Sequence, residues 1–186
     1  GWTDQNVAPA WQRRFVSIAG LAVDRTGIVY VAEDNGNAVF IWKVTPDGLA
    51  ELLAGGGSSH ELNDVDPRSA LLVGLQGITT GGDGTLFFTS VGRGWSDTVD
   101  VPGLRALRPD GRLYTIAGHS QGGAPSEQLP TDGSVAASAA LPSPRGLTVG
   151  PDGDLGTLSR TAVGVLGAAE VRLHPHFGAE ILAAYL

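Results

Sequence analysis

One stretch, Gly20–Gly55, most constrains the fold, because it divides into four short apolar runs separated by turn residues. The runs are Leu21–Val23, Ile28–Ala32, Ala38–Val44 and Leu49–Ala54. Val, Ile, Tyr, Phe and Trp dominate them, and such residues favour strands. The segments Arg25-Thr26-Gly27 and Pro46-Asp47-Gly48 are typical of tight turns. Four antiparallel strands in so short a stretch predict a sheet of the size of one propeller blade.

The same unit recurs twice further along the chain. The glycines that open the three units are Gly20, Gly77 and Gly146, and the linkers Asn63–Gly77 and Asp132–Gly146 align with each other on their final glycine. The repeat predicts three blades, at about residues 15–57, 72–120 and 141–186, after an N-terminal arm of residues 1–14. Within the arm, Trp2 and Trp11 are candidates to anchor it to a blade, and a loosely docked terminus is the alternative.

The third unit departs from the pattern at its second strand. There the segment Asp154–Gly167, DLGTLSRTAVGVLG, has Gly, Ser and Thr in place of an aromatic or branched run. Glycine inside a strand weakens pairing and packing. We therefore expect the third blade to lack a proper second strand.

Two motifs carry a family resemblance. The first is VYVAEDNGNAVFIWKVTPDG (Val29–Gly48), and the second is TIAG (Thr115–Gly118) followed by a linker that ends in Leu-Pro-Ser-Pro-Arg-Gly. In series they resemble the NHL-repeat family, in the teneurin-type variant of large bacterial surface proteins, over roughly residues 15–186. The resemblance implies an all-β propeller of four-stranded antiparallel blades that binds protein or glycan outside the cell.

Three blades do not close a ring, because propellers typically have four to eight. We expect a partial or open NHL-type β-propeller, roughly half of a six-bladed ring. A homodimer, or further blades in a longer chain, would complete it. The chain starts at Gly1 and contains no Met, which favours a segment of a longer polypeptide. Apolar blade faces left open should promote self-association.

Charge and composition exclude several classes of partner. The net charge of −7 argues against a nucleic-acid partner, and no apolar run is long enough to predict membrane insertion. The absence of Cys removes disulfides and cysteine catalysis. Lys43 is the only Lys among the 12 basic residues, and Ala and Gly are abundant, which indicates a GC-rich bacterial source. The bacterial source, together with the resemblance to extracellular NHL domains, predicts a secreted or cell-surface protein.

Long connections gather at one end of the predicted blades, and the tight turns lie at the other. We call the first end the long-loop face and expect it to bind ligand, since long loops on a rigid scaffold often do so. The alternative for each residue is an ordinary solvated turn. The candidate ligand-binding residues are Glu33, Asp34, Asn35, Asn37, His60, Asp64, Asp66, Arg93, Trp95, Asp97, His119 and Asp132.

The expected function is that of a non-catalytic binding module for a protein or glycan partner, with no cofactor and no catalytic residue. One alternative is a propeller-channel enzyme of the lactonase, strictosidine-synthase-like or amidating-lyase kind that uses a divalent metal. His60 and His119 follow corresponding strands of consecutive units and could converge on such a channel. Another alternative is a spacer in a long surface polypeptide.

Overall fold

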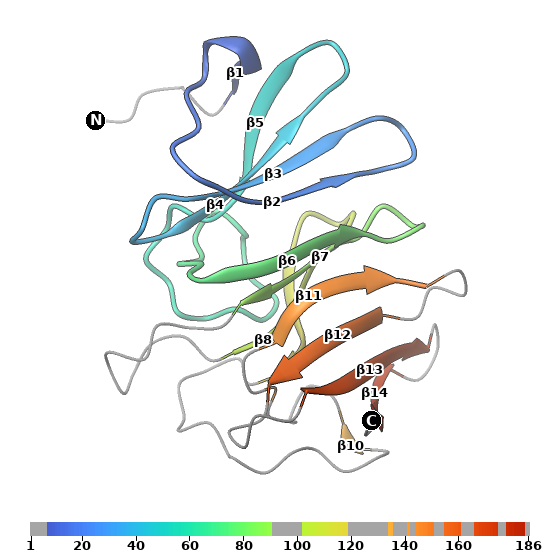
Figure 1. Ribbon diagram of the computed structural model, residues 1–186. Helices are drawn as coiled ribbons and strands as arrows, with labels where there is room; N and C mark the ends of the chain where they lie inside the picture. Colours follow the sequence, from blue (N-terminus) through green and yellow to red (C-terminus); the bar gives the residue numbers. More distant parts are fainter. Residues whose placement is uncertain are drawn as a thin grey trace.

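The computed structural model describes residues 7–90, 102–118, 134–135, 141, 144–150, 155–160, 166–174 and 178–184 of the 186-residue chain. Its strands form three antiparallel sheets, one for each repeat unit, which follow one another from blue to red in Figure 1. The predicted fold class is confirmed: this is an all-β chain of propeller blades in an open array. Within the described part, no helix is long and apolar enough to cross a membrane.

The first sheet, blade 1, has the strand order β1-β5-β4-β3-β2. Each of the four apolar runs predicted in Gly20–Gly55 gives one strand, and the tight turns fall between them as expected. A short 3₁₀ helix, Ala10–Gln12, follows β1. The strands are β1 (Val7–Pro9), β2 (Ile18–Val23), β3 (Val29–Asp34), β4 (Val39–Val44) and β5 (Leu49–Ala54).

Blade 3 repeats this order of five strands, and blade 2 repeats it without the additional edge strand. Blade 2 contains β6 (Leu75–Thr80), β7 (Leu86–Ser90), β8 (Gly103–Leu107) and β9 (Leu113–Gly118). Blade 3 contains β10 (Ser134–Val135), β11 (Pro144–Val149), β12 (Leu155–Arg160), β13 (Leu166–His174) and β14 (Gly178–Ala184).

The expectation that blade 3 lacks a second strand is wrong. Strand β12 pairs with β11 on one side and β13 on the other. Ladders on both sides satisfy its backbone groups despite the weak strand propensity of Gly156 and Ser159. Leu155, at the start of β12, is fully buried against blade 2. Tertiary pairing therefore overrides the local composition.

The segment before each blade covers the outer edge of that blade's last strand. Ala8, Val65 and Ser134 stand at the same sequence distance before Gly20, Gly77 and Gly146. Ala8 pairs with Ala50 of β5, Val65 forms a bridge to Leu113 of β9, and Ser134 pairs with Ile181 of β14. Such edge strands would otherwise present unpaired backbone groups. The N-terminal arm and the two linkers are thus paired with the last strands of the three blades.

Apolar clusters lie between the sheets. Between blades 1 and 2, Tyr30, Ala32 and Ile41 of blade 1 share a cluster with Ile78, Leu86 and Phe88 of blade 2 and with linker residues. A second cluster lies between blades 2 and 3, and its members are Phe87, Leu104, Ala106, Ile116, Ala117, Leu141 and Leu155. Face-to-face packing of consecutive sheets is the arrangement of a propeller.

The opening glycines mark the closest approach between the blades. A Cβ atom on Gly20 would lie 2.8 Å from Cγ2 of Ile78, and one on Gly77 would lie 2.9 Å from the backbone of Gly146. Strand β6 therefore contacts β2 on one side and β11 on the other. A side chain at these positions would push neighbouring blades apart.

The N-terminal arm is tied to blade 1 by backbone pairing and by Arg13. The guanidinium carbon of Arg13 lies 3.2 Å from the centre of the Trp42 ring. Trp11, in contrast, is 81% exposed, so it does not anchor the arm, and Trp2 lies outside the described residues.

The β2–β3 turn is held by the carboxylate of Asp24. Its Oδ1 accepts hydrogen bonds from the amide of Thr26 (2.8 Å), the hydroxyl of Thr26 (2.7 Å) and the amide of Ile28 (3.0 Å). These bonds, with that from the Thr26 hydroxyl the strongest, lower the pKa of Asp24 below its ordinary value of 3.8.

The lowered pKa of Asp24 predicts a dependence of stability on acid pH. The contribution of Asp24 is fully present above the unfolded-state pKa near 4 and is lost as the pH falls through the lower folded-state pKa. Asp24→Asn should therefore flatten the loss of stability below about pH 4. Urea unfolding across that range measures it, with exposed Asp47→Asn as the control. Equal acid sensitivity of Asp24→Asn and wild type would contradict the prediction.

Candidate functional site

The β3–β4 turn carries three of the predicted binding residues at the long-loop face. Oδ1 of Asp34 accepts a hydrogen bond from the amide of Gly36 at 2.8 Å. Oδ1 of Asn35 accepts from the amides of Asn37 (3.0 Å) and Ala38 (2.9 Å). These side-chain bonds fix the turn conformation. Asn35 and Asn37 remain exposed and Asp34 is half-buried.

An open hollow of about 620 Å³, the long-loop hollow, lies beside this turn, where β2 and β6 begin. It brings together two of the predicted residues, Asp34 and Asn35, with apolar groups and with polar groups that the sequence did not single out. Its lining residues are Val16, Ser17, Ala19, Asp34, Asn35, Gly36, Leu75 and Gln76. The lining of the hollow thus combines apolar groups with hydrogen-bonding groups.

Glu33, also predicted to bind ligand, has a different environment. It is only 4% exposed, and its Oε2 accepts hydrogen bonds from Arg13 Nη2 (3.2 Å) and Trp42 Nε1 (3.1 Å). Its Oε1 accepts from the amide of Val16 at 2.9 Å. Because both oxygens are engaged inside the protein, Glu33 holds the segment before β2 against blade 1, and we do not include it in the binding surface.

Asp64 does not lie at the long-loop face, so its predicted placement is wrong. The linker runs beside β9, with Val65 bridging Leu113, and this pairing carries Asp64 to the β8–β9 turn. Asp66 lines the space between blades 1 and 2 and pairs with Arg68. Asp64 accepts hydrogen bonds from the guanidinium of Arg112, through its side chain and its carbonyl. His60 is exposed on the same linker.

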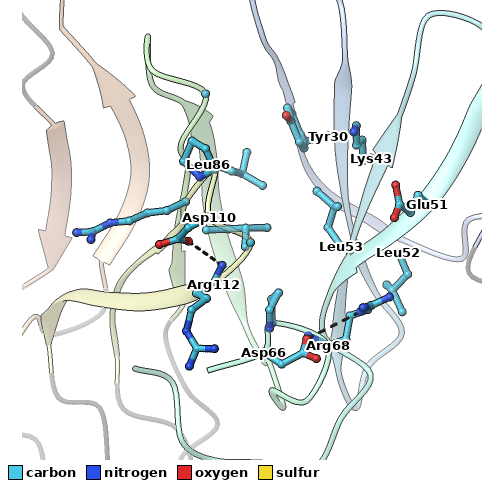
Figure 2. A pocket seen from close by; sticks show the side chains of 16 residues that line it. Tyr30, Lys43, Glu51, Leu52, Leu53, Asp66, Arg68, Leu86, Asp110 and Arg112 are labelled. Carbon is cyan, nitrogen blue, oxygen red and sulfur yellow. Dashed lines mark hydrogen bonds and ion pairs between the residues drawn. The ribbon is translucent and has the colours of Figure 1, made fainter. Parts of the chain in front are cut away.

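A second hollow, the inter-blade pocket of about 580 Å³, opens between blades 1 and 2 (Figure 2). Tyr30, Lys43 and Glu51 of blade 1 form one wall, and Asp110 and Arg112 of the β8–β9 turn face them across the opening. The linker closes its lower side. Leucines contributed by both blades also line it, namely Leu52, Leu53, Leu86 and Leu107.

Charges of both signs surround the inter-blade pocket. Lys43 and Glu51 are direct cross-strand neighbours. Arg108 stacks over Tyr114 at 4.3 Å from the ring centre, and the Tyr114 hydroxyl donates to Asp110 at 3.0 Å. That hydrogen bond raises the pKa of Tyr114. The sequence alone does not reveal this pocket, because its walls come from two blades and a linker.

Five predicted residues, Arg93, Trp95, Asp97, His119 and Asp132, lie outside the described residues. The convergence of His60 with His119 therefore stays a prediction. Among the residues that the structure describes, no three His, Cys, Asp or Glu side chains are grouped so that they could hold a metal ion.

The repeated sheets, the apolar packing between them and the edge-covering segments define a propeller-type repeat protein. No family model and no curated protein sequence matches this chain. Among solved structures, it is similar to one described as "Streptogramin B lyase structure", with 15% sequence identity and a TM-score of 0.33. That similarity covers 98% of this chain and 74% of the other. The assignment of the fold rests on the sheets themselves, and this similarity carries no functional argument.

Proposed function

We propose that this chain is a non-catalytic binding module of the NHL-repeat type, which engages a protein or glycan partner at the long-loop hollow. The observation that carries the proposal is the composition and shape of that hollow. Val16, Ala19 and Leu75 supply apolar surface, while Ser17, Asp34, Asn35 and Gln76 supply hydrogen-bonding groups around it. Apolar surface with a polar rim suits the recognition of sugars and of protein side chains.

The rigid base of the hollow supports this proposal. The β3–β4 turn is fixed by its own side-chain hydrogen bonds, and the segment before β2 is fixed by Glu33. A preorganised surface loses less conformational entropy when it binds. We further propose, from the residue motifs and the composition, that the module belongs to a larger bacterial protein that is secreted or displayed at the cell surface.

Gln76→Arg tests the hollow directly, because Gln76 is exposed and lines it. The labelled chain would be screened against an array of neutral and acidic oligosaccharides and against a displayed peptide library. Ligands retained by the wild type should bind Gln76→Arg at least about tenfold more weakly, since a long charged side chain fills part of the hollow.

Gln12→Arg is the matched control, because it makes the same exchange at an exposed residue of the 3₁₀ helix, outside the hollow. It should bind like the wild type. Equal binding by Gln76→Arg, or no retained ligand in either screen, would contradict the proposal. A stoichiometric divalent metal in the purified chain would favour the channel enzyme instead.

A further inference from the structure

Blade 1 exposes a row of apolar side chains along β2 and the residues that precede it. Val16 is 75% exposed, Ile18 53%, Leu21 56% and Val23 58%. We call these four residues the open strip. Strand β2 is the first strand of its blade and contacts β6 of blade 2, yet these side chains are not covered by it.

The repeat shows what these positions do in the next blade. When the units are aligned on Gly20 and Gly77, Val16, Ile18 and Leu21 correspond to Val73, Leu75 and Ile78. Those three are only 6%, 5% and 9% exposed. Leu75 and Ile78 belong to the apolar cluster between blades 1 and 2, so they are the positions at which a blade packs on the blade before it.

Blade 3 uses the same positions in the same way. Alignment on Gly146 places Pro144 opposite Leu75 and Leu147 opposite Ile78. Pro144 is fully buried, and Leu147 packs against the cluster between blades 2 and 3. The open strip therefore has the residues of a blade-docking surface, and no blade covers it among the residues that the structure describes.

Part of the same face of blade 1 is already closed. Arg13 lies over Trp42, and Val31 and Trp42 are each only 5% exposed. What remains open is the strip itself. Residues 15–23 include no charged side chain, so covering the strip would bury no charge.

We propose that the open strip binds the C-terminal blade of a second copy of this chain. The blades are arranged in series, β2 against β6 and β6 against β11, so blade 1 and blade 3 lie at the two ends of the array. A second copy would continue that series with the same kind of sheet-on-sheet contact. With twofold symmetry the contact forms twice, and two sets of three blades give six, within the range of closed propellers. Val16 also lines the long-loop hollow, but this inference rests on the exposure of the strip and on its equivalents in the other blades, not on ligand binding at the hollow.

Light scattering on the 186-residue chain tests the proposal. The wild type should have twice the 19.1 kDa mass of one chain and should dissociate on dilution. Leu21→Glu should weaken the dimer by more than about 100-fold, because it places a carboxylate in the apolar contact. Leu49→Glu is the matched control, since Leu49 is also exposed but lies on β5, and it should stay dimeric.

A far-UV circular dichroism spectrum and a melting curve establish that both variants are folded. If Leu21→Glu fails to fold, the wild type should still dissociate on dilution, and Ile18→Lys takes the place of Leu21→Glu as the variant expected to weaken the dimer. A wild type that stays monomeric up to about 100 µM, far above a Kd of about 1 µM, would overturn the proposal. So would a Leu21→Glu chain that remains folded and fully dimeric.

The order of the blades has its own test. A photo-crosslinking phenylalanine analogue at Leu21, in a mixture of isotopically light and heavy chains, reports which part of the partner copy lies on the strip. Cross-links between chains into β11 (Pro144–Val149) and β12 (Leu155–Arg160) are expected, because the first strands of consecutive blades contact each other. Cross-links from Leu21 into residues 7–54 of the partner would show blade 1 facing blade 1 and would overturn the proposed order.

Discussion

Replacing Gly55 by Ala should lower the free energy of unfolding by about 3 kcal/mol or more, whereas Gly48→Ala should cost only about 1 kcal/mol. Both glycines have a φ of 85°, a backbone conformation that L-residues rarely adopt. They differ in the space around them. A Cβ on Gly55 would lie well under 3.0 Å from the carbonyl oxygen of Val39 and 3.2 Å from Cα of Phe40, whereas a Cβ on Gly48 would meet nothing within 4 Å.

The clash at Gly55 involves backbone atoms, which cannot rotate away as a flexible side chain would. Relief would require moving β4 away from the end of β5, and the hydrogen bond from the Val39 amide to the Leu72 carbonyl (2.6 Å) ties β4 to the linker. Urea unfolding of the two variants measures the difference. Similar losses for Gly55→Ala and Gly48→Ala would show that backbone strain alone, and not the close approach, determines the cost.

Blade 2 has a glycine in the same kind of close contact with a neighbouring backbone. Gly118 is the last residue of β9, whereas Gly55 comes directly after β5; Gly118 has a φ of 87°, and a Cβ on it would meet the carbonyl of Pro102. The TIAG and LLAG endings of the two blades are therefore alike because both place a glycine where the chain passes close to a neighbouring backbone.

Local signals explain why most of the fold could be predicted from the sequence. Alternating apolar runs and turn glycines depend on residues close together in the chain, and these determined the strands of blades 1 and 2. The spacing of Gly20, Gly77 and Gly146 indicated the number of blades. The expectation failed at β12, because pairing with β11 and β13 is a long-range effect that its own composition does not show.

The candidate site was harder to predict because it depends on contacts between distant segments. The burial of Glu33 requires Arg13 and Trp42 to meet it, and the position of Asp64 depends on pairing with β9. The sequence did predict that an incomplete ring exposes apolar surface. It could not identify Leu21 as exposed and Ile78 as buried, because the two residues occupy equivalent positions in units that look alike.

Glu33→Ala should lower the free energy of unfolding by about 3 kcal/mol, because it removes the acceptor for three donors at once. Those donors are Arg13 Nη2, Trp42 Nε1 and the amide of Val16. The Arg13 guanidinium would lose its ion-pair partner above the Trp42 ring. Glu33→Gln keeps the shape and one acceptor oxygen, so it should cost less, about 1–2 kcal/mol. Chemical denaturation gives both values.

A double-mutant cycle with Arg13→Ala separates the ion pair from the rest of the effect. If the two side chains stabilise each other, the double variant should lose at least about 1 kcal/mol less than the sum of the single losses. Asp34→Ala is the matched control, because this neighbouring carboxylate is half-buried and, among the described residues, accepts a hydrogen bond only from the Gly36 amide. It should lower the free energy of unfolding by about 1 kcal/mol or less. Additive losses for Arg13→Ala and Glu33→Ala would contradict a coupled pair. In that case the segment before β2 would be held by the Val16–Glu33 and Asp34–Ser17 hydrogen bonds and by the β1–β5 pairing, without a contribution from the ion pair.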